Sequence, residues 1–203
     1  SLTELGIPVL LVNPESPDQL SDMISLIATA TNTQDKADQL LDFINQEKEM
    51  LTTSLATADG TPNIYLAGNS SLLSTAGPAM YQSGIIELAG GKNVASDISD
   101  TYWAEISYEQ LLSWDPDYII LASDAEYTVD DVLSDPNLKD CTAVKNNHVY
   151  AIPGDIEALD SPVPASILAS IWLAGILHPD QVSTDTYTKE MNSFYETFYG
   201  IKK

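Results

Sequence analysis

The sequence predicts an α/β protein in which helices flank a parallel sheet. After residue 60, short apolar runs typical of strands ("IYLA" at 64–67, "YIILA" at 118–122 and "VYAI" at 149–152) alternate with helical segments. The chain has 203 residues, of which 44% are hydrophobic, and this is enough to bury a core. The turn signal "DGTPN" precedes the first strand, so we expect a boundary near residue 60 and a C-terminal unit of about 140 residues.

The first 60 residues contain one apolar run and two helical segments. The run "PVLLV" at 8–12 has the continuous apolar character of a strand that is buried on both faces of a parallel sheet. Ser16 as N-cap and Pro17 at the first helical position predict a helix with one apolar face, formed by Leu20, Met23, Ile24 and Ile27. A second helix is expected over about 33–57, a rod of roughly 37 Å that is long enough to join two lobes.

Further helices are expected between the strands and at the end of the chain. They run from Pro78 to about Leu88, from Ser107, from Thr128 to Leu133, and over about 162–177 and 184–199. Ser107 and Gln110 form an S-x-x-Q capping box at the start of one helix. The "DPD" that follows ends this helix before the strand at 118–122.

The charge of the chain excludes several classes of partner. Thirty acidic residues oppose eight lysines, with no arginine, so the formal net charge is -22. Such a field repels phosphate backbones and anionic membranes, and nucleic acid is not an expected partner. No run reaches the roughly 18 apolar residues of a membrane span. The first residues lack an initiator Met, a basic start and a cleavage site, so we expect an excised piece of a longer protein.

The chemistry-bearing residues favour neither a metal centre nor catalysis. Cys141 has no second cysteine with which to form a disulfide. His148 leads into a strand and His178 has the setting of a helix C-terminal cap, so we expect no metal or cofactor. The motifs G-x-S-x-G, the P-loop and G-x-G-x-x-G do not occur, and we therefore do not expect an enzyme.

The carboxyl ends of the predicted strands are the expected place for a ligand. Open parallel sheets bind ligands beyond these ends, and here they lead into three polar, turn-rich loops at 68–78, 123–128 and 153–162, the last of which carries Asp155. Gly77 and Pro78 begin a predicted helix whose free N–H groups are oriented to face an anion.

Aromatic residues near these loops are candidate walls of the site. Trp103 precedes the capping box on a short connection, where its ring would form a flat apolar wall. Tyr81, Tyr102 and Tyr127 are further candidates. The alternatives are a half-buried core position for the tryptophan and amphipathic surface positions for the tyrosines.

An ordered string of motifs carries a resemblance to a known family. The segments are "GPAMYQSGIIELAGGKNVAS", "TYWAEISYEQLLSWDPDYIILAS", "VKNNHVYAIPGD" and "SPVPASILASIWLAGILHPD". Together they resemble the C-terminal half of the ABC-transporter substrate-binding proteins for iron-siderophores, haem and vitamin B12. The resemblance implies three parts: a remnant of an N-terminal lobe at 1–32, an interlobe helix at 33–59, and a Rossmann-like substrate-binding lobe at 60–203.

The resemblance also implies a function. A protein of this family captures a metal chelate or corrinoid between its two lobes, outside the cytoplasm, and delivers it to a membrane permease. Its lipid-attachment site would lie upstream of this chain. Trp103 matches an aromatic position that faces the cleft, and Glu109 matches the glutamate of an "S-x-E" unit that pairs with arginines of the permease. A purely local role for Glu109 is the alternative, because an acid in the first turn favours the helix dipole.

Other functions stay open at the level of sequence. A zinc- or manganese-binding protein of a related cluster needs several His and carboxylate ligands from both lobes. A ligand sensor without a transport role is a further alternative, because the fold alone does not fix function. The absence of arginine favours a ligand held by aromatic and apolar walls, such as a cobamide or a neutral chelate, over a highly anionic siderophore.

Overall fold

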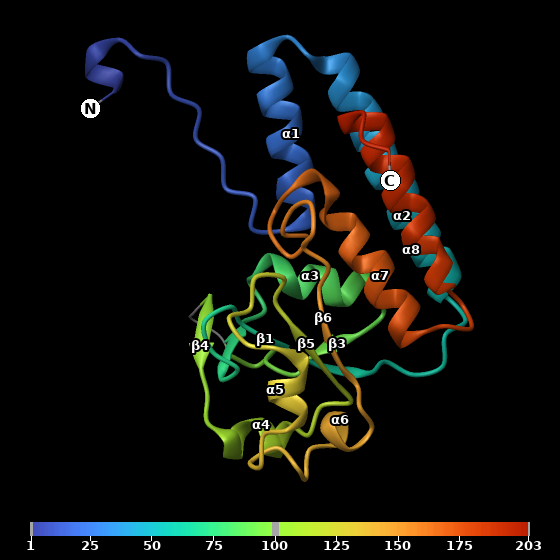
Figure 1. Ribbon diagram of the computed structural model, residues 1–203. Helices are drawn as coiled ribbons and strands as arrows, with labels where there is room; N and C mark the ends of the chain where they lie inside the picture. The colour runs from blue at the N-terminus through green and yellow to red at the C-terminus, as the bar shows by residue number, and fades with distance from the viewer. Residues whose placement is uncertain (1, 99–101, 203) are drawn as a thin grey trace.

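The computed structural model describes residues 2–98 and 102–202, which form three layers (Figure 1). A central sheet is covered on one face by α3 (Tyr81–Leu88) and α7 (Ile167–Leu177). The short helices α4 (Tyr108–Trp114), α5 (Val129–Leu133) and α6 (Thr142–Lys145) cover the opposite face. The predicted α/β architecture is therefore confirmed.

Three further helices pack beyond α3 and α7: α1 (Pro17–Thr31), α2 (Gln34–Leu55) and α8 (Thr184–Phe194). Short 3-10 turns occur at Thr3–Leu5 and Pro164–Ser166, and a π-helical turn at Tyr195–Tyr199 extends α8. The rings of Phe43 on α2 and Phe194 on α8 lie 5.3 Å apart, so these two helices run side by side. The predicted long helix is confirmed; it begins one residue later and ends two residues earlier than expected.

The sheet is mixed rather than wholly parallel. Its strands are β1 (Asn63–Ala67), β2 (Ser74–Ala76), β3 (Lys92–Asn93), β4 (Trp103–Glu105), β5 (Tyr118–Leu121) and β6 (Val149–Ala151). Among the described residues the order is β4-β2-β1-β5-β6, with β3 beside β1. The pairs β1–β3, β1–β5 and β5–β6 are parallel, whereas β1–β2 and β2–β4 are antiparallel. Trp103 therefore lies in a strand and not on the irregular connection that the sequence suggested.

Alternation along β1 explains why the strand runs are apolar throughout. Ile64 and Leu66 point into the core beneath α3 and α7, whereas Tyr65 and Ala67 point into the core above α4 and α5. β5 alternates in the same way. Burial on both faces is the condition under which β1 and β5 carry no polar side. The strand predictions at 64–67, 118–122 and 149–152 are confirmed by β1, β5 and β6.

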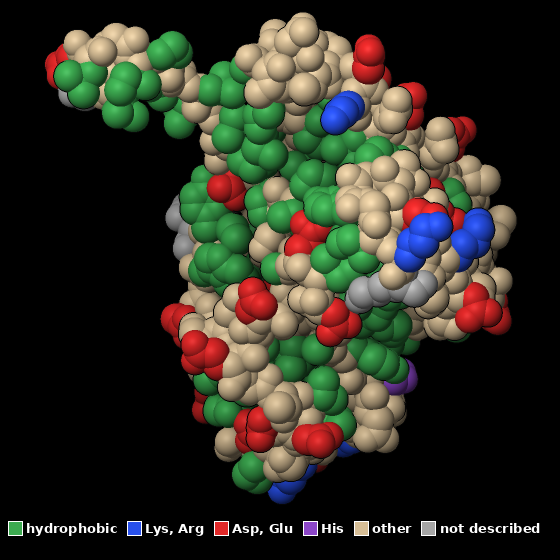
Figure 2. Space-filling view, turned by 45° about the horizontal axis from the view of Figure 1, so that its top comes forward, with side chains coloured by type: hydrophobic (Ala, Val, Ile, Leu, Met, Phe, Trp, Pro, Cys, Tyr) green, Lys and Arg blue, Asp and Glu red, His purple; other side chains and the backbone are tan. Residues whose placement is uncertain are grey.

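The predicted strand at 8–12 is wrong. These residues form an extended arm that stands off from the body, with hydrophobic side chains exposed along it (Figure 2). Leu11 is 88% exposed. A strand requires a neighbour with which to exchange backbone hydrogen bonds, and no described strand lies beside the arm. Ile27, expected on the buried face of α1, is exposed as well, while Leu20 and Ile24 are buried as predicted.

The start of α3 also differs from the prediction. Residues 78–80 form a turn, and the helix begins at Tyr81 instead of Pro78. The Met80 N–H and the Ser83 hydroxyl both donate to the Gly77 carbonyl, and buried Asn93 donates to Ser83 Oγ. The predicted helix at 162–177 likewise begins later, at Ile167, after the 3-10 turn. Both helices are preceded by proline-containing turns that sequence periodicity does not separate from the helix.

Pro17 at the start of α1 rests directly on α3. A Cβ atom added at Gly84 would lie 2.8 Å from Cδ and 2.9 Å from Cγ of the Pro17 ring. Only a residue without a side chain permits this approach, so Gly84 sets the distance between the N-terminal helices and the sheet layer.

Gly84→Ala tests this contact. Alanine is favoured over glycine in a helix by about 1 kcal/mol, but the clash with the rigid proline ring reverses the sign, and we expect the free energy of unfolding to fall by about 1–3 kcal/mol. Urea denaturation measures it. Gly175→Ala in α7 is the matched control, because its Cβ would meet Thr184 Cα at an ordinary 3.5 Å. A Gly84→Ala chain as stable as Gly175→Ala would contradict the account.

Candidate ligand-binding site

The three polar loops predicted at the carboxyl ends of the strands meet in the structure. The Tyr127 hydroxyl donates to the Gly68 carbonyl at 2.6 Å, and the Glu126 N–H donates to the Asn69 carbonyl at 2.8 Å. These bonds join the loop after β5 to the loop after β1. Ser123, directly after β5, donates from its N–H and its hydroxyl to Asp160, and so joins the loop after β6. The loops therefore form one continuous polar edge.

Trp103 lies over this edge. It is the first residue of β4, opposite Ala76 of β2, and it is 37% exposed. Its Cζ3 atom lies 3.0 Å from the position that a Cβ of Gly68 would occupy, so the ring covers the start of the loop after β1. A half-exposed indole on the rim of a sheet edge is able both to pack and to contact a ligand. The partial exposure of Trp103 is compatible with either interpretation, and ligand contact stays a prediction.

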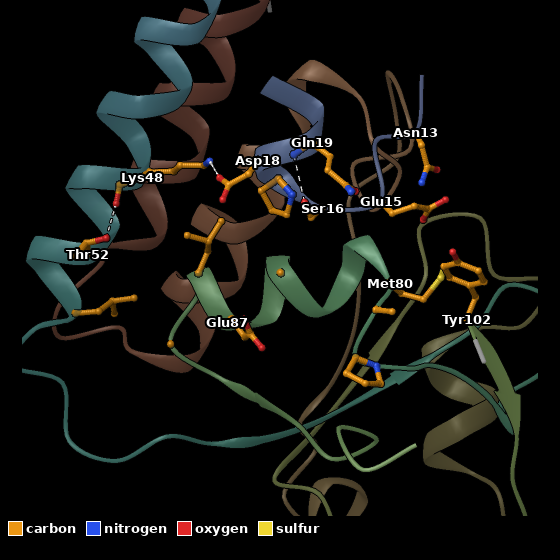
Figure 3. A pocket seen from close by; sticks show the side chains of 17 residues that line it. Asn13, Glu15, Ser16, Asp18, Gln19, Lys48, Thr52, Met80, Glu87 and Tyr102 are labelled. Carbon is orange, nitrogen blue, oxygen red and sulfur yellow. Dashed lines mark hydrogen bonds and ion pairs between the residues drawn. The ribbon is translucent and has the colours of Figure 1, made fainter. Parts of the chain in front are cut away.

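Tyr102 connects the edge to a groove between the starts of α1 and α3. Tyr102 is 55% exposed, and its carbonyl accepts from the Gly77 N–H at 2.8 Å. The groove has a volume of about 940 Å³, and Tyr102, Met80, Glu15 and Asn13 lie at one end of it (Figure 3). The exposed ring and the thioether give this end an apolar surface that adjoins the polar loops.

The opposite end of the groove is formed by α2. Lys48 Nζ lies 3.1 Å from the Asp18 carboxylate, and Thr52 and Glu87 line the groove nearby (Figure 3). The cation at this end is therefore neutralised by a partner from the start of α1. The groove as a whole presents carboxylates, amides and apolar groups.

Two of the predicted site residues do not face the edge. Tyr81 is 4% exposed, and its hydroxyl shares a 2.6 Å hydrogen bond with Ser166 Oγ. Burial raises the pKa of this phenol. The Gly77 N–H, expected to face an anion, donates instead to Tyr102. The helix α3 begins at Tyr81, three residues later than expected. The hydrogen bonds of Tyr81 and Gly77 therefore hold the start of α3 in position and are not directed at a ligand.

Tyr127 and Asp155 occupy different settings. Tyr127 is half-buried with its hydroxyl engaged, and desolvation raises its phenol pKa. Asp155 is exposed on the loop after β6 and faces Tyr187 of α8, whose pKa is raised by burial and by the Asp155 charge. Tyr127 therefore orders the edge, whereas Asp155 lies beside α8, in a hollow that Tyr187 and Met191 also line.

Four residues of this region were missed by sequence reasoning: Asn13, Glu15, Met80 and Asp160. Asn13 and Glu15 follow the run at 8–12, which was assigned to a strand, and Met80 was assigned to a helix. Asp160 is inside the loop at 153–162, but nothing in the sequence indicates that it is buried. The only indication in the sequence for Asp160 is that it belongs to the loop at 153–162, which follows a predicted strand.

Glu109 lies in the first turn of α4, and its carboxylate is exposed. Hydrogen bonds from its own backbone N–H and from the Ser107 hydroxyl lower the pKa of the Glu109 carboxyl. Ser107 caps the helix, with its Oγ accepting from the Gln110 N–H at 3.2 Å, which is one half of the predicted capping box. Glu109 thus interacts favourably with the start of its own helix, as the local interpretation requires. Pairing of Glu109 with arginines of a permease stays a prediction.

The histidines and the cysteine have structural surroundings. His148 Nδ1 lies 3.2 Å from the Asp117 carbonyl, and His178 Nε2 lies 3.2 Å from the Gly90 carbonyl. Cys141 is buried. Within residues 2–98 and 102–202, no group of three or more His, Cys, Asp and Glu side chains is arranged to hold a metal ion. In the same ranges, no helix has the length and apolar character to cross a membrane.

The three-layer fold and its open polar edge define one α/β lobe with a long helix leading away from it. The chain belongs to the periplasmic binding protein family, whose family model matches residues 1–156. The resemblance in the sequence is thereby confirmed at the level of the family.

Two curated relatives carry different ligand names. The molybdate-binding protein MolA of Haemophilus influenzae is 28% identical over 185 residues, which are 90% of this chain and 52% of that protein. The vitamin B12-binding protein of Salmonella choleraesuis is 31% identical over 124 residues, 61% of this chain and 46% of that protein. The chain spans about half the length of these relatives.

Solved structures share the fold over the whole chain. A periplasmic solute binding protein from Veillonella parvula is 25% identical with a TM-score of 0.86, covering 100% of this chain and 62% of that one. Haemophilus influenzae MolA bound to molybdate is 22% identical with a TM-score of 0.85, covering 100% and 68%. The second likeness shows the fold alone.

Tyr127→Phe tests whether one hydroxyl ties two loops of the edge together. The change removes the donor to the Gly68 carbonyl, so we expect the free energy of unfolding to fall by about 1 kcal/mol. Amides of residues 68–72 and 123–128 should also exchange faster with solvent. Hydrogen exchange measured by NMR gives both the free energy of unfolding and the local exchange rates. Tyr102→Phe, which changes an exposed tyrosine, is the control. Equal exchange rates in the two variants would show that the Tyr127 hydroxyl does not hold the two loops together.

Proposed function

We propose that this chain is part of the solute-binding component of an ABC importer, which captures a metal chelate or corrinoid (iron-siderophore, haem or cobamide class) and delivers it to a membrane permease. Membership of the periplasmic binding protein family supports the proposal, as does the vitamin B12-binding relative. We further propose that the protein acts outside the cytoplasm and is held there by a lipid anchor upstream of this chain.

The observation that carries the proposal is the pair of exposed aromatic rings at the carboxyl edge. Trp103 and Tyr102 are adjacent residues, both exposed: the Trp103 ring covers the start of the loop after β1, and Tyr102 lines the groove. Macrocyclic chelates present a large flat apolar face together with polar side groups. An aromatic wall beside a polar edge fits both parts of such a ligand.

The site is proposed to be shared between two lobes. Residues 60–203 form the substrate-binding lobe, 33–59 the interlobe helix, and 1–32 a remnant of a second lobe. The exposed arm at 8–12 and the open side of the groove support this division. On this proposal a ligand contacts only one wall of its cleft in the isolated chain, and binding is correspondingly weak.

A second candidate ligand is a molybdate-like oxyanion. It is favoured by the MolA relative, whose match covers 90% of this chain. A zinc or manganese site receives no such support from the described residues. A sensor without a transport role shares the ligand site and differs only in its partner, so the partner surface at Glu109 distinguishes the two.

Trp103→Ala tests the aromatic wall. In the full-length protein we expect the affinity for corrinoids and haem, measured by isothermal titration, to fall by about 1–3 kcal/mol, with little change in the melting temperature. Trp114→Ala is the matched control, because Trp114 packs on the core near Tyr65, at 6.3 Å between ring centroids, and should lower stability instead. A Trp103→Ala chain that loses stability but not affinity would assign Trp103 to the core.

Glu109→Ala tests delivery to a permease. Because the carboxylate is exposed on α4, its removal should leave ligand affinity unchanged and reduce uptake in vesicles that contain the full-length protein and its importer. Asp130→Ala is the control, since Asp130 is also an exposed acid in the first turn of a short helix. Equal uptake with both variants would leave Glu109 as a helix-dipole residue and favour the sensor.

A further inference from the structure

The two curated relatives are named for ligands of different charge. Molybdate is a small oxyanion, whereas vitamin B12 is a large corrinoid whose cobalt centre bears positive charge. An oxyanion needs several unengaged N–H or O–H donors, and commonly a cation, at one place in the site. The donors and charges of the described edge therefore indicate which class of ligand it accepts.

The most central donors of the edge are already engaged by an internal carboxylate. Ser123 follows β5, between β1 and β6 in the sheet order, and its hydroxyl donates to Asp160 Oδ1 at 2.5 Å. Its N–H points to Asp160 Oδ2 at 3.4 Å. Asp160 is only 4% exposed. Gly154 closes the other side, because a Cβ there would lie 3.0 Å from Ser123 Cβ.

Other backbone donors around the edge are also paired. The Gly68 N–H donates to the Ser74 carbonyl at 2.7 Å, and the Gly77 N–H to the Tyr102 carbonyl at 2.8 Å. The Thr128 N–H at the start of α5 donates to Asp131 Oδ2 at 2.8 Å. The start of α3 has no side-chain cap, but the groove beside it is lined by Glu15.

The charges of the edge have one sign. The loops at 68–78, 123–128 and 153–162 contain no lysine, arginine or histidine. They do contain the exposed acids Asp124, Glu126 and Asp155. Lys48, which lines the far end of the groove, is paired with Asp18. An anion placed beside Ser123 would therefore meet donors that Asp160 already engages, together with the carboxylates of the surrounding loops.

We propose that Asp160, buried against Ser123, is a specificity-determining residue that excludes oxyanions from the site and selects ligands with a neutral or positive face. Its carboxylate occupies the Ser123 donors and adds a buried negative charge beneath the ligand. This inference rests on the proposed solute-binding function and assigns the charge class of its ligand. Asp160 acts through Ser123 and through its field, and it need not contact the ligand.

The test varies ligand charge while keeping ligand shape. Aquocyanocobinamide carries a net positive charge and dicyanocobinamide is neutral, and the two share one corrin ring; molybdate is the oxyanion probe. Each is titrated into the isotopically labelled chain, and the amide shifts of Gly68, Ser123 and Gly154 are followed by NMR. We expect the positive corrinoid to bind about threefold or more tightly than the neutral one, with no response to millimolar molybdate.

Asp160→Asn removes the charge and keeps the shape. We expect the two corrinoids to bind equally in this variant, and molybdate affinity to rise by about tenfold. Ser123→Ala removes the hydroxyl and keeps the charge, so the preference for the positive corrinoid should persist. Asp180→Asn, an exposed change in the turn between α7 and α8, controls for net charge and should behave as the wild type.

The outcomes separate the inference from the proposed function. If molybdate binds the wild-type chain more tightly than either corrinoid, the charge filter is overturned, while a solute-binding function stands. If the corrinoids bind but the Asp160→Asn variant still prefers the positive one, Asp160 does not determine the charge preference. A chain that binds none of the three probes overturns the corrinoid proposal and the inference with it. Should Asp160→Asn fail to fold, Asp160→Ser, which also removes the charge and keeps a polar group beside Ser123, takes its place with the same expected results.

Discussion

Parallel pairing of β1 with β5 is the constraint on which the rest of the structure depends. The register joins Ile64 to Tyr118 and Ala67 to Leu121, so the two strands end at the same edge. Parallel strands need crossover connections, and these supply the helices that cover both faces. The loops that follow the strands must then emerge together. The shared edge, with Ser123 and Gly68 at its centre, is a direct consequence of this pairing.

Local chemistry made much of the fold predictable. Ser16, Ser107 and Thr128 each accept from a backbone N–H at a helix start, as their positions in the sequence indicate. The strands that are buried on both faces were recognisable from their unbroken apolar runs. β2 and β4 were not, because each has three residues and is specified by pairing across the chain, through Thr75 opposite Ala104, rather than by its own pattern. The arm at 8–12 is the opposite case. Its sequence is typical of a strand, but it forms none because no described strand lies beside it.

The candidate site was predictable in position but not in detail. Loops at the carboxyl ends of strands follow from topology, and Trp103 and Tyr102 are exposed there as expected of wall residues. Tyr81 is not, because its ring is buried at the first position of α3 and its hydroxyl is hydrogen-bonded to Ser166. The pairing of Asp160 with Ser123 joins residues 37 positions apart, and no local pattern indicates it. Burial of polar side chains is decided by tertiary contacts that composition and periodicity do not contain.

We propose that the carboxyl edge, with Trp103 upon it, is the ligand site. A crystal structure of the chain with a corrinoid bound tests this most directly. The account predicts that the corrin ring lies against Trp103 and Tyr102, with its polar side groups toward the loops at 68–78 and 123–128. A ring bound instead at the opposite edge of the sheet, in the hollow of about 360 Å³ lined by Asp59, Pro62 and His148, would contradict it.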